Sequence, residues 1–145
     1  TGSFALNAAR GGAEHVTAVD ISQSAIDMAR ANAVRNGLEG RMDFLTADVF
    51  DLLTELEKKG GKPYDFIILD PPAFTKSRKT VKSAERGYKD INLRALRLLP
   101  RGGYFATASC SHFMPSELFE KMPDHPILWN VPETDYLKFY LFQVV

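Results

Sequence analysis

Short continuous apolar runs and segments with the apolar spacing of a helix follow one another along this chain. This succession predicts alternating strands and helices. Short apolar runs that are typical of buried strands occur at His15–Val19, Met42–Thr46, Tyr64–Leu69 and Tyr104–Ala108. Segments with helical spacing occur at Ala5–Arg10, Ser22–Gly37, Val49–Lys59 and Ile91–Leu99. This order predicts an α/β fold, a doubly wound parallel sheet with helices on both faces. The β-prone run Tyr136–Val145 is expected to return as an antiparallel final strand.

Two places in the pattern lack an element. No strand precedes the helical stretch Ala5–Arg10, although a doubly wound sheet needs a central first strand there. Near Met122-Pro123 the connection to the last strand is too short for the helix, strand and turn that we expect. We therefore expect residues 1–145 to be a fragment of one domain, without its first strand and with a gap near residues 122–123.

Composition narrows the class of protein. The length of 145 residues suits one domain, and 18 basic residues balance 18 acidic ones, so no global field attracts nucleic acid or membrane. No apolar stretch approaches the roughly 20 residues that span a bilayer. The single cysteine, Cys110, excludes an internal disulfide and a cysteine-rich zinc site. We expect a cytoplasmic protein without metal or membrane, and a homodimer stays open.

Three acids follow three successive apolar runs: Asp20, Asp48 and Asp70. The carboxyl ends of parallel strands share one edge, so these acids and the preceding turn Gly2-Ser3-Phe4 are expected around one crevice. Asp20, roughly 20 residues after the glycine turn, suits the two ribose hydroxyls of an adenosine cofactor. The fingerprint of three spaced glycines is absent, which favours a cofactor without a pyrophosphate, such as S-adenosylmethionine.

The stretch Asp70-Pro71-Pro72-Ala73-Phe74 ends the third apolar run. The prolines fix φ and remove two backbone donors, so neighbouring carbonyls are free to face a substrate. The flat ring of Phe74 follows within reach. This arrangement suits an enzyme that grips a planar base beside a cofactor, and a simple turn is the alternative.

Together these residues resemble a known family. The stretches Thr1–Ala9, Val19–Ser22, Asp70–Phe74, Ser109–His112 and Asp124–Lys138 are similar to class I S-adenosylmethionine-dependent methyltransferases, and most of all to the RlmI-like enzymes that make 5-methylcytosine in large-subunit ribosomal RNA. The resemblance implies a Rossmann-like methyltransferase sheet, an amino-terminal PUA-type RNA-binding domain that is absent from these residues, and a first strand before Thr1.

The resemblance also implies roles for individual residues. Those that would border the methionine end of the cofactor are Thr1, Gly2, Ser3 and Phe4. Asp20 would hold the ribose, Ile21 would pack on the adenine, and Asp48 with the backbone of Val49 would read the adenine amino group. Asp70 and Pro71 would lie beside the point of methyl transfer.

Cys110 would be the nucleophile. Carbon 5 of cytosine reacts poorly until a thiolate adds to carbon 6, and cysteine suits this step because a few per cent of it is thiolate near neutral pH. Asp70 could hydrogen-bond the ring as charge builds. Many RNA 5-methylcytosine enzymes carry a second cysteine after the paired prolines, where this chain has Ala73.

Substrate contacts are expected from the loop residues near these motifs. The residues named for this role are Pro72, Phe74, Lys76, Arg78, Lys79 and His112. The basic ones could contact RNA phosphates, which would make binding depend on salt, or could form an ordinary solvated loop. Asp48 could equally cap the helix that follows it, and Cys110 could be a buried structural cysteine.

Two other functions stay open. One is a nitrogen- or guanine-directed RNA methyltransferase of the same fold, which would use a similar loop of an acid and two prolines. The other is a catalytically silent cofactor-binding module in ribosome assembly. In the first alternative the aromatic residue usually follows the prolines directly, whereas Ala73 intervenes here, and the presence of Asp70-Pro71-Pro72 and of Cys110 counts against the silent module.

Overall fold

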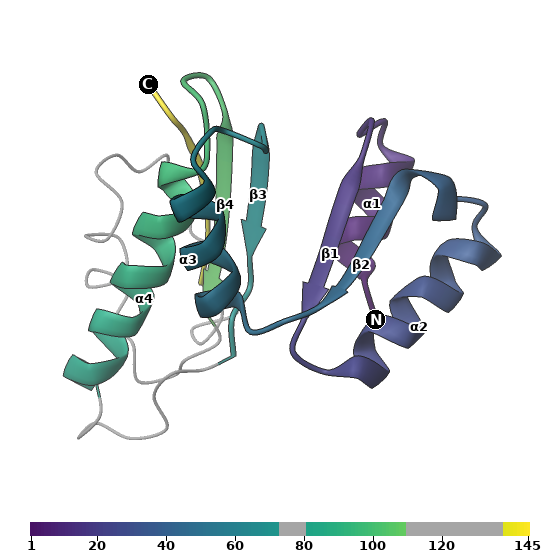
Figure 1. Cartoon of the computed structure of the whole chain (residues 1–145), viewed down its shortest axis with the longest axis horizontal. Helices are drawn as coiled ribbons and strands as arrows, with labels where there is room; N and C mark the ends of the chain where they lie inside the picture. The colour runs from purple at the N-terminus through teal and green to yellow at the C-terminus, as the bar shows by residue number, and fades with distance from the viewer. Residues whose placement is uncertain (73–80, 110–137) are drawn as a thin grey trace. The chain divides into compact units, whose positions relative to one another are not determined.

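The computed structural model describes residues 1–72, 81–109 and 138–145 (Figure 1). The elements are α1 (Ser3–Arg10), β1 (Val16–Asp20), α2 (Gln23–Arg35), the 3₁₀-helix η1 (Glu39–Arg41), β2 (Met42–Thr46), α3 (Val49–Lys59), β3 (Phe66–Leu69), α4 (Val81–Arg97), β4 (Tyr104–Ser109) and β5 (Lys138–Gln143). They divide into two compact units, Thr1–Leu52 and Leu53–Val145, so that α3 begins in unit 1 and ends in unit 2.

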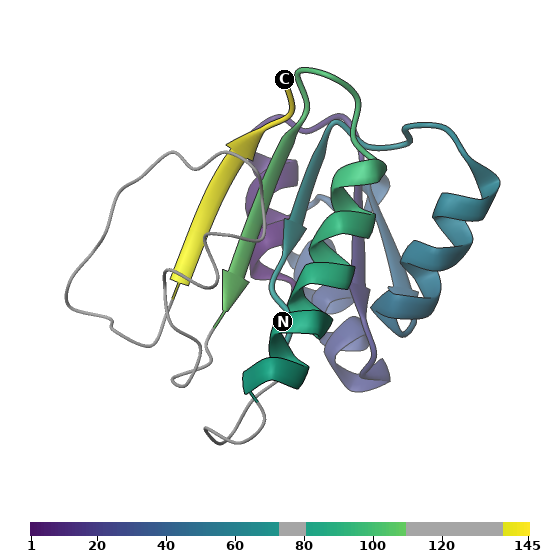
Figure 2. The same ribbon diagram turned by 90° about the vertical axis from the view of Figure 1, so that its left-hand side faces the viewer.

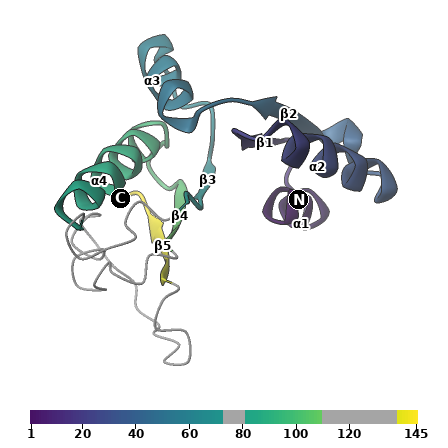
Figure 3. The ribbon, with the colours of Figure 1, turned by 90° about the horizontal axis from the view of Figure 1, so that it is seen from below.

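Unit 1 is built on a parallel pair of strands. Strands β1 and β2 pair in register from Val16 opposite Met42 to Asp20 opposite Thr46. Seen along the strands, α1 and α2 lie beside this pair (Figure 3), and both helices contact β1. A small core of Ala9, Ala33 and Met42 holds helices and strands together. The carboxyl ends of both strands therefore share one edge of this sheet.

Helix α2 forms where its sequence predicts it. The side chain of Ser22 caps the helix by accepting a hydrogen bond from the amide of Ala25 at 3.4 Å. The residues that face the sheet, Ile26, Ala29 and Ala33, are buried. Gly37, at φ +64°, ends the helix in a left-handed conformation that favours glycine.

Unit 2 contains a three-stranded sheet in the order β3-β4-β5. Strand β3 is parallel to β4, and β5 is antiparallel to β4, as the sequence predicts for the final strand. Helix α4 runs along β3 and β4 (Figure 2) and contacts both. The helix positions that are almost fully buried are Ala84, Tyr88, Ile91, Asn92 and Ala95.

Charged side chains join α3 to α4 within unit 2. The guanidinium of Arg94 binds Asp90 at 3.0 Å and Glu57 at 3.1 Å, and Arg97 binds the other oxygen of Glu57 at 2.8 Å. The hydrogen bond to Asp90, with the charges of Asp90 and Glu57, raises the pKa of Arg94. These partly exposed pairs link the two helices, although each is expected to add little stability.

The structure corrects one prediction about unit 2. Helix α4 begins at Val81, ten residues before the predicted start at Ile91, so residues 81–90, for which no helix was predicted, are helical. The remaining predicted strands and helices appear with bounds that differ by a few residues at most. Within the described residues, no helix is both long enough and apolar enough to cross a membrane.

Candidate functional site

The carboxyl edge of β1 carries the first predicted site residue. Asp20 is exposed, and its Oδ1 accepts a hydrogen bond from the amide of Ser22 at 2.8 Å. The amide of Ala47 donates to the carbonyl of Asp20 at 3.1 Å and so ties the ends of β1 and β2 together. Ile21, between Asp20 and the helix cap, leaves 70% of its surface exposed. An oriented carboxylate thus stands next to an uncovered apolar side chain.

Asp48 follows β2 at the same edge of unit 1. Its Oδ1 accepts from the amide of Phe50 at 2.8 Å, and its carbonyl accepts from the amide of Leu52 at 3.0 Å. Asp48 therefore caps α3, as the structural alternative predicts, while its carboxylate stays exposed. A cap role and a ligand role are compatible, because a carboxylate has two oxygens and about four acceptor sites.

The glycine turn lies against α2. Gly2 has a φ of +74°, and a Cβ built on it would approach the Cβ of Ala29 to 2.7 Å. The amide side chain of Asn32, also in α2, donates to the carbonyl of Thr1 at 3.2 Å. Ser3 is exposed, and the ring of Phe4 is 48% exposed. The turn thus touches the helix that starts just after Asp20, within the same unit.

The third acid belongs to unit 2. Asp70 is exposed and follows Leu69, which is buried and lies opposite Thr107 of β4. Pro71 is buried and Pro72 is exposed, so the first proline anchors the loop and the second faces outward. The structure therefore brings Asp20 and Asp48 to one edge of unit 1, and sets Asp70 at the carboxyl end of β3 in unit 2. The other predicted residues, Phe74, Lys76, Arg78, Lys79, Cys110 and His112, lie outside the described residues.

The family model described as a methyltransferase domain matches residues 1–139. The chain belongs to this family. The methyltransferase domain has 44% identity over 160 residues to "Ribosomal RNA large subunit methyltransferase I" of Aeromonas salmonicida, covering 95% of this chain and 40% of that protein. The protein of the same name from Klebsiella pneumoniae strain 342 is 39% identical over 167 residues, covering 100% and 42%. The chain thus spans about two fifths of these relatives.

A solved structure supports the fold and the cofactor class. SMU.776, a candidate methyltransferase complexed with SAH, superposes with a TM-score of 0.82 at 25% identity, covering 99% of this chain and 43% of that one. These findings confirm the predicted α/β, Rossmann-like fold class. They also confirm the prediction of an S-adenosylmethionine-dependent methyltransferase. The resemblance of the sequence to the ribosomal RNA methyltransferases is also confirmed.

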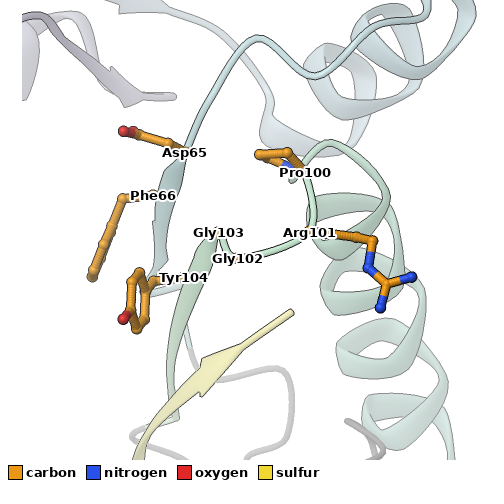
Figure 4. A pocket seen from close by; sticks show the side chains of 7 residues that line it. All are labelled: Asp65, Phe66, Pro100, Arg101, Gly102, Gly103 and Tyr104. Carbon is orange, nitrogen blue, oxygen red and sulfur yellow. The ribbon is translucent and has the colours of Figure 1, made fainter. Parts of the chain in front are cut away.

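A shallow hollow of about 340 Å³ lies at the amino ends of β3 and β4 in the methyltransferase domain (Figure 4). Its lining includes Asp65, Phe66, Arg101 and Tyr104. The rings of Phe66 and Tyr104 stack with centroids 6.1 Å apart. Because β3 begins at Phe66 and ends before Asp70, this hollow is not at the edge that carries the predicted acid. In parallel sheets ligands bind at the carboxyl ends, so the hollow is a poor candidate for the active site.

Sequence reasoning missed a buried polar cluster between α4 and β4. The hydroxyl of Ser109 donates to the hydroxyl of Tyr88 at 2.9 Å, and Thr107 donates to the Oδ1 of Asn92 at 3.0 Å. All four side chains are at most 1% exposed. Only the register of β4 and the full length of α4 bring these residues together, so the sequence alone carried no signal for the pairing.

Proposed function

We propose that this methyltransferase domain methylates carbon 5 of a cytosine in large-subunit ribosomal RNA, through a covalent adduct with Cys110. The names of the two relatives support ribosomal RNA as the substrate. The observation that carries the carbon-5 proposal is the parallel pairing of β3 with β4, in which Leu69 lies opposite Thr107. Asp70 and Cys110 accordingly follow the carboxyl ends of neighbouring strands, where a base could meet both.

The edge of unit 1 fits the adenosine part of S-adenosylmethionine. The exposed carboxylate of Asp20 is preset by Ser22 and can accept from both ribose hydroxyls. The exposed side chain of Ile21 offers an apolar surface for the adenine ring, and the carboxylate of Asp48, with the backbone of Val49, can read the adenine amino group.

The glycine turn supports the same assignment. Gly2 passes so close to Ala29 that a Cβ would collide, so the turn is held against α2, and its residues Thr1, Gly2, Ser3 and Phe4 are proposed to border the methionine end of the cofactor. When bound, S-adenosylmethionine supplies a methyl group activated by a positively charged sulfur.

In the proposed chemistry, Cys110 and Asp70 act on the base. The thiolate of Cys110 adds to carbon 6 of cytosine, and the new bond makes carbon 5 nucleophilic enough to accept the methyl group. Asp70 hydrogen-bonds the ring as charge develops. The proton on carbon 5 then passes to water, its electron pair re-forms the double bond between carbons 5 and 6, and the carbon–sulfur bond to Cys110 breaks to return the thiolate. Pro71 and Pro72 hold the loop that presents Asp70, and Pro72, Phe74, Lys76, Arg78, Lys79 and His112 are proposed to contact the RNA.

The first test is the nucleophile. Cys110→Ser should abolish formation of 5-methylcytidine in unmodified, transcribed large-subunit RNA, measured by mass spectrometry of nucleosides, while calorimetric binding of S-adenosylmethionine stays unchanged. RNA containing 5-fluorocytidine should trap the unchanged enzyme covalently. Substantial residual activity in the serine variant contradicts the role of Cys110. A methylated guanosine or a nitrogen-methylated base supports the first alternative, and binding without any product supports the silent module.

The second test is the cofactor. Calorimetric titration should show binding of S-adenosylmethionine and none of NAD. Asp20→Ala should weaken the binding about 10- to 100-fold, because hydrogen bonds to a charged group contribute about 1.5–3 kcal/mol. Asp43→Ala is the matched control, since Asp43 is an exposed acid near the amino end of β2 that pairs with His15. Equal affinities for the two variants would refute the ribose role of Asp20.

A further inference from the structure

Two polar pairs fill the interface between α4 and β4 where apolar side chains would be expected. The residues of β4 that face α4 are Phe105, Thr107 and Ser109, and all are at most 1% exposed. Tyr88 and Asn92 lie one turn apart on α4 and meet Ser109 and Thr107. The two hydrogen bonds therefore follow one another along β4, and the Tyr88 pair is the one at the carboxyl end of the strand.

Stability alone gives no reason for these polar pairs. A buried hydrogen bond adds little net stability over a well-packed apolar pair, and a buried donor without a partner is unfavourable. Among the described residues, the Nδ2 of Asn92 has no hydrogen-bond partner although it is buried. Such bonds are directional, however, and they fix the position of one element on another more sharply than apolar contacts do.

The position of Ser109 in the chain indicates what its hydrogen bond with Tyr88 contributes. Ser109 is the last residue of β4, and Cys110 follows it directly in the sequence. The register that sets Leu69 opposite Thr107 also brings this end of β4 level with the start of the Asp70 loop. A restraint on Ser109 is therefore a restraint on the residue that presents the proposed nucleophile.

We propose that Tyr88 is a positioning residue for Cys110: its buried hydroxyl binds Ser109 and so fixes the end of β4 from which the thiol reaches the base. The inference rests on the proposed function, because it assumes that Cys110 is the nucleophile. Tyr88 is not expected to contact the cofactor or the RNA. Its ring fills space in the core, and its hydroxyl sets the geometry of the strand end.

The test compares two buried hydrogen bonds of the same interface in the full-length enzyme. Tyr88→Phe keeps the ring and removes the hydroxyl that accepts from Ser109. Thr107→Val is the matched control, since it removes the neighbouring bond to Asn92 three residues before Cys110. Tyr88→Phe should lower kcat about 10- to 100-fold, the range expected for a small misplacement of a reacting group, with KM for RNA and Kd for S-adenosylmethionine unchanged. Thr107→Val should keep kcat within about twofold, because it lies outside the restraint on Ser109.

A second measurement does not depend on methylation. The rate at which iodoacetamide alkylates Cys110, followed on its peptide by mass spectrometry across pH, should change in Tyr88→Phe and stay unchanged in Thr107→Val. In a double-mutant cycle, Tyr88→Phe with Ser109→Ala should lower kcat no further than either single change, because both changes remove the same bond between the two hydroxyls.

The outcomes separate this inference from the proposed function. If Cys110→Ser is inactive while Tyr88→Phe retains full kcat and an unchanged alkylation profile, the positioning role is wrong and the nucleophile stands. Equal losses of kcat in Tyr88→Phe and Thr107→Val, in step with their melting temperatures, would also overturn it. If Cys110→Ser remains active, the proposed function itself fails.

Discussion

The contact of Gly2 with α2 makes a sharp prediction for Gly2→Ala. Gly2 has a φ of +74°, and an added Cβ would lie 2.7 Å from the Cβ and 3.3 Å from the Cα of Ala29. Rotation of a side chain cannot relieve this overlap, because Cβ and Cα move only with the backbone. Either the glycine turn or α2 must shift, and Ala29 is buried against the rest of unit 1.

Two terms set the magnitude. The left-handed conformation costs a residue with a Cβ about 1–2 kcal/mol. Forcing an extra methyl group into a packed contact costs about 1–3 kcal/mol more. We therefore expect Gly2→Ala to lower the free energy of unfolding by about 2–5 kcal/mol. The matched control is Gly37→Ala, since Gly37 has a φ of +64° and nothing within 4 Å of its added Cβ, so only the first term applies.

Urea denaturation followed by circular dichroism measures both variants. The difference between them isolates the contact with Ala29, and the double variant Gly2→Ala with Ala29→Gly should recover part of the loss in a double-mutant cycle. Equal urea midpoints for Gly2→Ala and Gly37→Ala would show that the turn can shift without an energetic cost. The close approach of Gly2 to Ala29 would then not constrain the residue at position 2. Because the turn is proposed to border the cofactor, Gly2→Ala should also weaken the calorimetric affinity for S-adenosylmethionine, whereas Gly37→Ala should not.

Two smaller predictions concern single hydrogen bonds. Ser22→Ala should lower the free energy of unfolding by about 1 kcal/mol, measured by denaturation, because α2 loses its side-chain cap; no change would mean that the 3.4 Å bond contributes nothing. Thr107→Val should lower the free energy of unfolding by about 1–3 kcal/mol, because it leaves the Oδ1 of buried Asn92 without its hydrogen-bond donor. The double variant Thr107→Val with Asn92→Leu should be close to neutral, because both polar groups are removed. An equally large loss in the double variant would contradict this account of the buried pair.

Most helices and strands could be predicted from the sequence because capping and turn residues mark where they begin and end. Helix α3 has the predicted bounds, Val49–Lys59, since Asp48 caps its start and Gly60, at φ +72°, follows its end. The first half of α4 escaped prediction because charged residues and Gly87 dominate it. Its buried positions, Ala84, Tyr88 and Ile91, do keep helical spacing, but the apolar signal is diluted until Ile91.

The candidate site, too, could be predicted from the sequence only in part. Acids that follow apolar runs are visible in the sequence, and Asp20 and Asp48 do share one edge of unit 1 because β1 and β2 are parallel and in register. The pair of Tyr88 with Ser109 was not predictable, since its residues are 21 positions apart and meet only through the packing of a helix on a strand. Local spacing reveals which residues end strands, whereas side-chain partners across elements depend on register.

Asp20 and Asp48 are held by the same local device. Each carboxylate accepts the amide two residues later, from Ser22 and from Phe50, at 2.8 Å. Each bond lies at or just before the start of a helix, where free amides and the helix dipole favour a negative charge. Both carboxylates are therefore oriented by backbone amides while remaining exposed. A ligand that binds them loses little affinity to ordering of the protein, since the turns have already fixed the acceptors. The same short arrangement, a strand followed by an acid and the start of a helix, thus occurs twice at one edge of unit 1, and both copies present an acceptor whose position is already fixed.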